Sequence, residues 1–150
     1  MTSIPEFMTH KHRECDECFI AAENAVTENN WPLAKQDFHR FSTELELHLQ
    51  AEENIIFPEF EQATGITQGP TQVMRGEHQQ MRALVTDLSK AIIDENKTVY
   101  FGLSETLMVL MQQHNMKEEM MLYPMTQQRV PAPDLLLSRV VEHCHSTEHG

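Results

Sequence analysis

The chain has 150 residues, and its 11 Lys and Arg against 23 Asp and Glu give a formal net charge of −12. This length suits one domain with a sizeable core. An acidic chain gains nothing from counterion release at phosphates, so neither nucleic acid nor a membrane surface is an expected partner. No apolar run has the length of a membrane span, and no secretory signal is evident. Three Cys argue against a disulfide framework, so we expect a cytoplasmic protein with reduced thiols.

Four breaks rich in Asn, Gly, Pro or charged residues divide the chain. They lie at residues 29–32, 65–70, 94–97 and 130–133. Between them, apolar residues recur at spacings of three and four, which is typical of amphipathic helices, and no useful stretch alternates with period two. Pro32, Pro70 and Pro133 suit the first turn of a following helix. We therefore predict an all-α fold, with residues 1–130 forming an up-down-up-down four-helix bundle. Residues 131–150 are predicted to form a short fifth helical tail, either packed on the bundle or frayed from it.

Two segments that lie 66 residues apart are near-copies of each other. Residues 48–58 start with His-x-x-x-Glu and end in Phe-Pro, while residues 114–124 start in the same way and end in Tyr-Pro. The same shift carries His12 onto His78. A His and a Glu four residues apart differ by about 40° around a helix, so both face the core. Neighbouring helices run antiparallel, and the four His lie at equal distances from the helix connections. They therefore meet at one height in the bundle, and the sequence predicts a layer of four imidazoles and two carboxylates there.

Six side chains of this layer are the predicted metal ligands. They are His12, His48, Glu52, His78, His114 and Glu118. Burying these groups without partners would be costly, and a pair of divalent transition-metal ions removes that cost. Imidazole nitrogen together with carboxylate oxygen suits Fe, Mn or Zn. In this arrangement two His bind each ion, and each Glu can bridge both ions. Glu53 and Glu119 lie about 100° further around their helices and are expected on the solvated face rather than among the metal ligands.

The doubled motif resembles the hemerythrin-like (HHE cation-binding) domain family over about residues 8–127. The residues that carry the resemblance are His12, His48-x-x-x-Glu52 with Phe57-Pro58, His78, and His114-x-x-x-Glu118 with Tyr123-Pro124. The resemblance implies a four-helix bundle that holds a non-haem di-iron centre. In that family the His cap two Fe ions, and two carboxylates and an oxo or hydroxo group bridge them.

One position departs from the oxygen-carrying members of the family. Those members have a fifth His, in a His-x-x-x-His on the third helix, whereas Met74 and Arg82 stand four residues before and after His78 here. A two-plus-two His set lacks the asymmetry that oxygen carriage needs. The four-His set looks more like the relatives that repair iron centres under nitrosative stress, or that sense or handle iron.

We therefore expect a protein with two Fe ions, with Zn or Mn as alternative metals, that reacts with or senses O2, NO or peroxide. An iron- or zinc-binding storage or regulatory module without turnover is an open alternative, and a purely structural bundle is a third. The sequence leaves open whether the protein is an enzyme, and it is compatible with a homodimer. We expect four side chains to form the apolar wall of the site, namely Met74, Met81, Met111 and Leu45.

The remaining Cys and tail His residues are interpreted without a metal role. Cys15 and Cys18 form a C-x-x-C on the first helix, where helix packing is favoured over redox or metal chemistry. Cys15 should pack beside the metal layer. The tail cluster at residues 143–145, together with His149, contains ligands for a second zinc site with these Cys, but a frayed terminus is favoured.

Three further residues are assigned positions from the helical pattern. His10 and His39 should face away from the ligand layer. Tyr123 belongs to the aromatic-Pro pair and is interpreted as a plug at the end of a helix.

Overall fold

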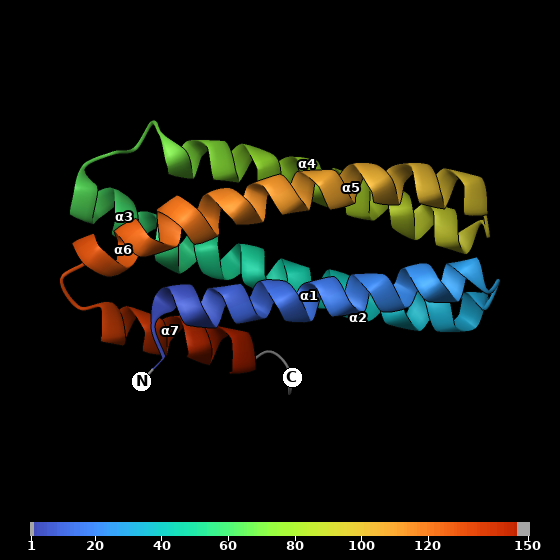
Figure 1. Ribbon diagram of the computed structural model, residues 1–150, viewed down its shortest axis with the longest axis horizontal. Coiled ribbons are helices and arrows are strands. Elements are labelled where there is room, and N and C mark those ends of the chain that lie inside the picture. Colours follow the sequence, from blue (N-terminus) through green and yellow to red (C-terminus); the bar gives the residue numbers. More distant parts are fainter. Residues whose placement is uncertain (1, 147–150) are drawn as a thin grey trace.

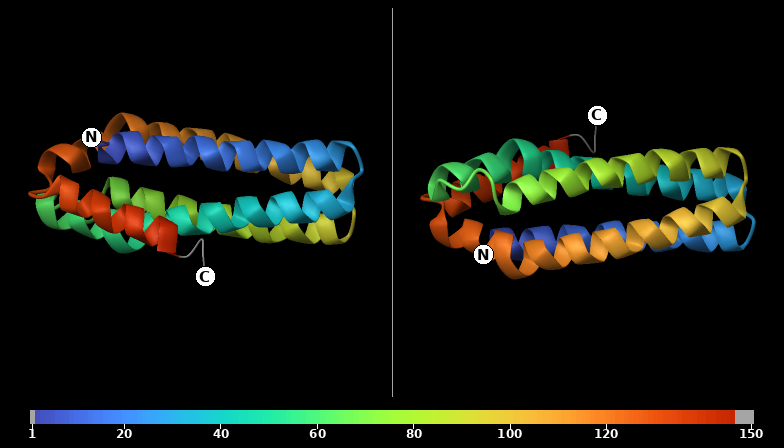
Figure 2. Two further views of the ribbon diagram at one scale, coloured as in Figure 1. Left: turned by 90° about the horizontal axis from the view of Figure 1, so that it is seen from below. Right: turned by 90° about the horizontal axis from the view of Figure 1, so that it is seen from above.

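The structure is a computed structural model, and it describes residues 2–146. All regular secondary structure in this range is helical, which confirms the predicted all-α class. Four long helical rods run in up-down-up-down order, and a shorter helix packs beside the end that holds the N-terminus (Figure 1). The first and third connections lie at one end of the bundle and the second at the other (Figure 2).

Two of the four rods are single helices, and two are interrupted by a π-helical turn. The single helices are α1 (Ile4–Thr27) and α4 (Pro70–Ile93). The second rod consists of α2 (Trp31–Ala51), η1 (Glu52–Ile56) and α3 (Phe57–Thr64). The fourth rod consists of α5 (Lys97–Lys117), η2 (Glu118–Leu122) and α6 (Tyr123–Arg129). The short helix is α7 (Pro133–Ser146).

The first and third connections are built in the same way. Asn30 and Asn96, which are 66 residues apart, cap α2 and α5 by accepting a hydrogen bond from a backbone N–H three residues on. The residue before each cap, Asn29 or Glu95, has a positive φ of 59° or 52°. Equal connections give both helical hairpins the same register, so the two halves of the bundle are structural copies.

The repeated motif widens its helix into a π-turn at the same place in both halves. The Phe57 N–H bonds to the carbonyl of Glu52, and the Tyr123 N–H bonds to the carbonyl of Glu118. These bonds span five residues instead of four, which defines a π-turn. The Pro after each aromatic residue has no N–H and crowds the preceding turn, and the wider turn accommodates it. The helix therefore continues through the Pro in both rods.

Two apolar clusters lie on either side of the predicted ligand layer. The first, toward the first and third connections, is built around Phe19, Phe38 and Phe41. The second, at the opposite end, contains Phe57 and Phe60 and is covered by α7. The two clusters fix the four rods above and below the layer.

The tail is helical as far as residue 146, and it is packed on the bundle as far as Cys144. Leu136, Val140 and Cys144 of α7 are buried in the second cluster, and α7 lies alongside α2 (Figure 2). Residues 143–145 therefore belong to a helix, and the expected fraying does not begin before them. His149 lies outside the described residues.

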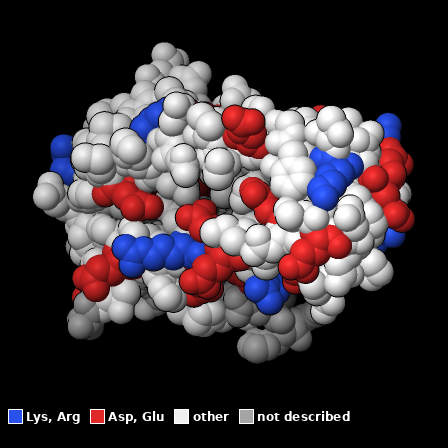
Figure 3. Space-filling view, turned by 45° about the vertical axis from the view of Figure 1, so that its right-hand side comes forward, with Lys and Arg blue, Asp and Glu red and all other residues white. Residues whose placement is uncertain are grey.

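The described part of the chain contains no helix long and apolar enough to cross a membrane. On the face shown in Figure 3, acidic side chains are spread widely and basic ones are fewer. This distribution agrees with the net charge of −12 and offers no broad basic surface for a polyanion on that face.

Candidate metal centre

The six predicted ligands meet in one buried layer. The helices α1 and α4 contribute one His each, and the second and fourth rods contribute one His and one Glu each. The most exposed of the six, His48, is only 6% accessible. Two groups of their donor atoms lie within 4.8 Å of one another: Glu52, His78, His114 and Glu118, and His12, His48 and Glu118. The predicted meeting of all six side chains is therefore observed.

The four imidazoles form two pairs, each of which defines a possible ion position. We call the space between His78 and His114 position A, and the space between His12 and His48 position B. The ring centroids are 5.0 Å apart in the first pair and 4.6 Å apart in the second. The Nε2 atoms of His12 and His48 are 3.1 Å apart, so both face the same point.

Glu118 directs one oxygen toward each position. Its Oε1 lies 3.1 Å from His12 Nε2, and its Oε2 lies 3.2 Å from His114 Nε2. A carboxylate placed in this way is suited to bridging two cations.

Glu52 does the same from the opposite rod. Its Oε1 lies 3.0 Å from His78 Nε2, and its Oε2 lies 3.7 Å from His48 Nε2. Position A is therefore faced by two imidazole nitrogens and one oxygen from each carboxylate, and position B by two imidazole nitrogens, one oxygen of Glu118 and, farther away, Oε2 of Glu52.

The geometry of the layer fits a metal ion better than a set of hydrogen bonds. His114 Nε2 and Glu118 Oε2 are buried and 3.2 Å apart, yet neither has a hydrogen-bond partner in the described part of the chain. Such buried polar atoms are rare and costly. A cation between them would satisfy both atoms, and nitrogen and oxygen donors without thiolate suit Fe, Mn or Zn.

Outer carboxylates hold three of the four imidazoles. Oε2 of Glu53 lies 2.7 Å from His78 Nδ1, and Oε2 of Glu119 lies 2.7 Å from His12 Nδ1. Their side chains are only 22% and 34% exposed, so their assignment to a solvated face is wrong. Both residues lie in the π-turns, where the step of about 100° per residue of an α-helix does not apply.

The third outer carboxylate, Glu77, was not predicted from the sequence. Its Oε1 lies 2.8 Å from His114 Nδ1, and its Oε2 lies 2.5 Å from the ammonium of Lys117. Glu77 directly precedes His78, and the i, i+4 spacing used to find ligands gives no weight to it.

The family comparison agrees with this geometry. The model of the hemerythrin HHE cation binding domain matches residues 3–126. The chain belongs to this hemerythrin family. A search of curated proteins and a search of solved structures gave no match. Family membership and the buried His and Glu groups together indicate that this hemerythrin-like domain binds metal.

Tyr123 is part of the hemerythrin-like layer rather than a plug at a helix end. Its side chain is fully buried, and its hydroxyl can donate to Glu52 Oε2 at 2.7 Å or to Glu118 Oε1 at 2.8 Å. The same oxygen lies 3.1 Å from His12 Nε2 and 3.3 Å from His48 Nε2. The prediction was wrong because the π-turn carries the helix through the Pro. The hydroxyl therefore lies where the donors of position B converge.

The counterpart of Tyr123 at position A has no hydroxyl. Phe57 precedes Tyr123 by 66 residues and stacks on His78, with centroids 5.5 Å apart and an interplanar angle of 28°. The difference between Phe and Tyr in the repeated motif is the sequence signal that distinguishes Tyr123 from its counterpart.

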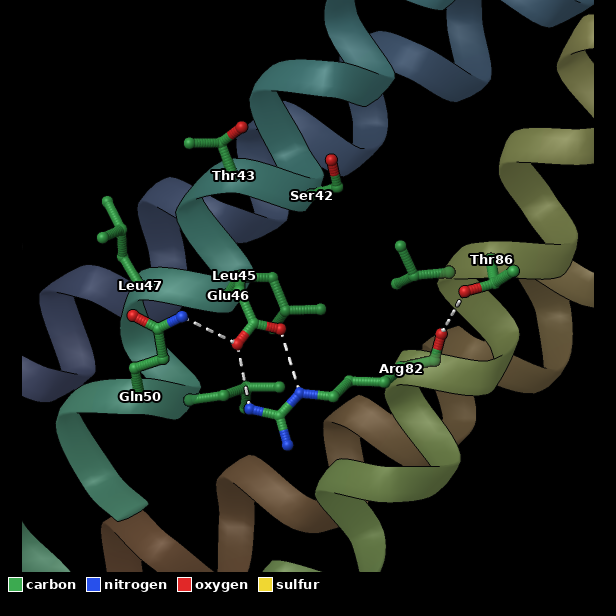
Figure 4. Close-up of a pocket in the computed structure, with 10 residues that line it drawn as sticks. Ser42, Thr43, Leu45, Glu46, Leu47, Gln50, Arg82 and Thr86 are labelled. Carbon is green, nitrogen blue, oxygen red and sulfur yellow. Dashed lines mark hydrogen bonds and ion pairs between the residues drawn. The ribbon is translucent and has the colours of Figure 1, made fainter. Parts of the chain in front are cut away.

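Arg82 holds the outer carboxylate of position A from a groove between α2 and α4. It bonds to Glu46 at 2.9 and 3.0 Å and to Glu53 at 2.8 and 3.0 Å. Figure 4 shows the guanidinium reaching across the groove to Glu46. The groove has a volume of about 560 Å³ and is lined by none of the six layer residues. Arg82 occupies one of the two positions at which a fifth His would extend His78 into a His-x-x-x-His.

A small cavity adjoins the layer on the side of the first apolar cluster. Its volume is about 10 Å³, and His12, His48 and His114 line it. The apolar lining includes three of the four predicted wall residues, Leu45, Met81 and Met111. Met74 is buried in the second cluster instead. A cavity of this size holds about one water-sized molecule.

Charges within the layer shift the titration of its members. Burial lowers the pKa of His48, but the carboxylates of Glu52 and Glu118 outweigh it and raise that pKa to about 9. The same balance raises the pKa of His114 to about 11. Burial raises the pKa of Glu52, but the charge of His48 and several hydrogen bonds lower it well below the usual value. Burial, with the charges of Glu118 and Glu52, raises the pKa of Tyr123 well above its usual value.

The other His and Cys residues of the described chain lie outside the layer. His10 bonds to Glu14 at 2.8 Å and its side chain is 67% exposed, and His39 is exposed as well, so both face away as predicted. Cys15 packs in the first cluster and lines the small cavity. Burial raises the pKa of its thiol well above the usual value, which disfavours the reactive thiolate. Within residues 2–146, the groups able to hold a cation include neither Cys15 nor residues 143–145.

Proposed function

We propose that this hemerythrin-like chain binds two iron ions, one at position A and one at position B, and reacts with or senses O2, NO or peroxide. The observation that carries the proposal is the pair of carboxylates, each of which directs one oxygen to each position. Two imidazoles at each position complete a donor set that suits iron, and that also accepts Zn or Mn. A response to nitrosative or oxidative stress fits this chemistry.

The chain's own residues bind, orient and shield the ions. The iron pair would supply one-electron chemistry and open coordination sites for a small molecule. Tyr123 holds a proton on its hydroxyl oxygen beside position B and can donate it as a hydrogen bond. Leu45, Met81 and Met111 exclude bulk water from the cavity beside the imidazoles.

A storage or regulatory module without turnover is the second candidate. The specific observation in its favour is the burial of all six donors, the most exposed of which is 6% accessible. Such a closed layer favours firm retention of metal over rapid exchange of ligands. The cytoplasmic location and the homodimer stay predictions.

Metal analysis and visible absorption of protein from iron-sufficient cells test the proposal. We expect two irons per chain, a visible ferric absorption, and a change of that absorption when NO or peroxide is added. A colourless protein with two zinc ions and no spectral response would favour the second candidate. A metal-free protein whose melting temperature does not respond to EDTA would contradict both.

A pair of double variants with equal loss of His sharpens the test. His48→Ala with His114→Ala removes one imidazole from each position, and we expect loss of metal and a lower melting temperature. His10→Ala with His39→Ala removes two exposed imidazoles and should retain two ions per chain. Retention of two ions by the first variant would show that the assigned ligands are wrong.

A further inference from the structure

The fourth imidazole of the layer lacks the outer carboxylate that the other three have. The Nδ1 atoms of His12, His78 and His114 each lie 2.7 or 2.8 Å from a Glu oxygen. The Nδ1 atom of His48 is buried and has no hydrogen-bond partner among residues 2–146. A ligating Nε2 leaves the ring proton on Nδ1, so His48 would carry a buried donor that nothing accepts.

The internal repeat explains the missing carboxylate. A shift of 66 residues carries His114 onto His48, and it carries Glu77, the partner of His114, onto Lys11. The Lys11 ammonium lies 3.6 Å from Glu14. An ammonium has donors and no acceptor, so Lys11 cannot take the proton of Nδ1 as Glu77 does.

The cations that hold the outer carboxylates also differ between the two positions, and they too favour position A. At position A, Arg82 holds Glu53 at 2.8 and 3.0 Å, and Lys117 holds Glu77 at 2.5 Å. The repeat places an aspartate, Asp16, and an alanine at the counterparts of these two cations. Position A therefore has two oriented imidazoles whose carboxylates are themselves fixed, and position B has one oriented imidazole whose carboxylate lacks a repeat-related cation.

We propose that the two ion positions are unequal, with a firmly held ion at A and an exchangeable ion at B, and that Lys11 sets the difference. This inference rests on the proposed dinuclear centre. A carboxylate on Nδ1 fixes the ring and makes Nε2 a stronger donor, and its loss costs about 10–100-fold in metal affinity. The Tyr123 hydroxyl lies 3.1 and 3.3 Å from the same Nε2 atoms that an ion at B needs.

The unequal positions also place the reactive side of the centre. His12 and His48 both line the small cavity, whereas of the position A imidazoles only His114 does. A small molecule in the cavity would therefore lie beside both imidazoles of position B and one imidazole of position A. Each position has two His, so the His count shows no difference between them. The difference lies in the outer carboxylates and in the cations that hold those carboxylates.

Release of zinc from the full chain tests this inference. Metal-free protein is loaded with two equivalents of Zn²⁺ and mixed with an excess of the chromophoric chelator 4-(2-pyridylazo)resorcinol. We expect one ion per chain in each of two phases, with rates at least about tenfold apart. Lys11→Glu should slow the fast phase about tenfold, and Glu77→Met, which removes the acceptor of His114 Nδ1, should accelerate the slow phase by a similar factor.

Two control variants separate hydrogen bonding from charge. Lys11→Met removes the ammonium without supplying a carboxylate or an amide acceptor, and it should leave the fast phase within about twofold. Lys35→Glu makes the same change of net charge at an exposed residue and should leave both phases within about twofold. In the zinc-loaded protein, nitrogen-resolved NMR should show three downfield ring N–H protons, and a fourth in Lys11→Glu.

Three results would overturn the inequality while leaving the two-ion centre intact. They are release of both ions in a single phase, an unchanged fast phase in Lys11→Glu, and equal slowing by Lys11→Glu and Lys35→Glu. If Lys11→Glu does not fold, Glu77→Met decides alone, and an unchanged slow phase then contradicts the inference. Binding of fewer than two zinc ions by the unmodified chain would instead contradict the proposed centre.

Discussion

Arg82 connects the open groove to position A through a chain of contacts, and its removal is a sensitive test of how that position is held. The guanidinium bonds to Glu53, and Glu53 accepts from the ring of His78. Arg82→Met keeps most of the apolar stem and removes all four hydrogen bonds. We expect it to lower both the stability of the fold and the affinity of position A for metal.

The magnitudes follow from exposure. Arg82 is 27% exposed and Glu46 is 40% exposed, so water screens that pair and it contributes about 0.5 kcal/mol. Glu53 is 22% exposed, and its paired, charge-assisted bonds contribute about 1 kcal/mol. A total near 1.5 kcal/mol lowers the melting temperature of a domain of this size by roughly 3–6 °C. Freeing Glu53 leaves His78 less firmly oriented, which costs about tenfold in metal affinity.

Glu61→Gln is the matched control. Glu61, on α3, accepts from Arg75 of α4 at 2.5 and 3.3 Å, and this variant removes that ion pair while it leaves Arg75 over the ring of Phe57. Thermal unfolding of the metal-free proteins should show a comparable loss for both variants. Zinc competition titrations should show weaker binding only for Arg82→Met. The role given to Glu53 would be refuted if Arg82→Met bound zinc as tightly as the unmodified chain. It would also be refuted if the control variant lost as much zinc affinity as Arg82→Met.

Two further predictions concern the hydroxyl in the layer and the pH dependence of folding. Tyr123→Phe deprives Glu52 and Glu118 of a buried donor and should destabilise the metal-free protein by about 2 kcal/mol in chemical denaturation, with a smaller loss in the zinc-loaded protein. A loss of equal size in both forms would contradict the placement of the hydroxyl. The hydrogen bonds from Arg75 and Thr71 lower the pKa of Glu61 below its usual value of 4.5. The stabilisation by Glu61 is therefore complete above pH 4.5 and is lost as the pH falls through the lowered pKa, so the deficit of Glu61→Gln in urea melts at pH 7 should shrink toward pH 3. A deficit that is constant across this range would argue against the ionised contact.

The fold and the meeting of the six side chains followed from periodicity and the internal repeat. The helix face that a residue occupies and its distance from the nearest connection determine where it lies in an antiparallel bundle. Both are the same for His12, His78 and the two His-x-x-x-Glu motifs. Three of the four breaks were marked by Pro32, Pro70 and Pro133 at the start of the next helix, and the break at residues 94–97 was marked by its Asn and charged residues.

The parts that were missed depend on local backbone geometry and on contacts between helices. Glu53, Glu119 and Tyr123 lie in or directly after π-turns, and a pattern based on 3.6 residues per turn places them incorrectly. Glu77 reaches a His on a neighbouring helix, which no spacing within one helix reveals. The role proposed for Lys11 follows from the contact of its repeat counterpart, Glu77, with His114, and that contact is seen only in the structure.

The location of bound iron tests the central claim most directly. Crystals of the iron-loaded protein, measured at the iron absorption edge, should give two anomalous peaks in the buried layer. One should lie between His12 and His48 and the other between His78 and His114, each about 2.0–2.2 Å from imidazole nitrogen, as is usual for transition metals bound by His. A single peak, or iron bound only outside the layer, would contradict the account.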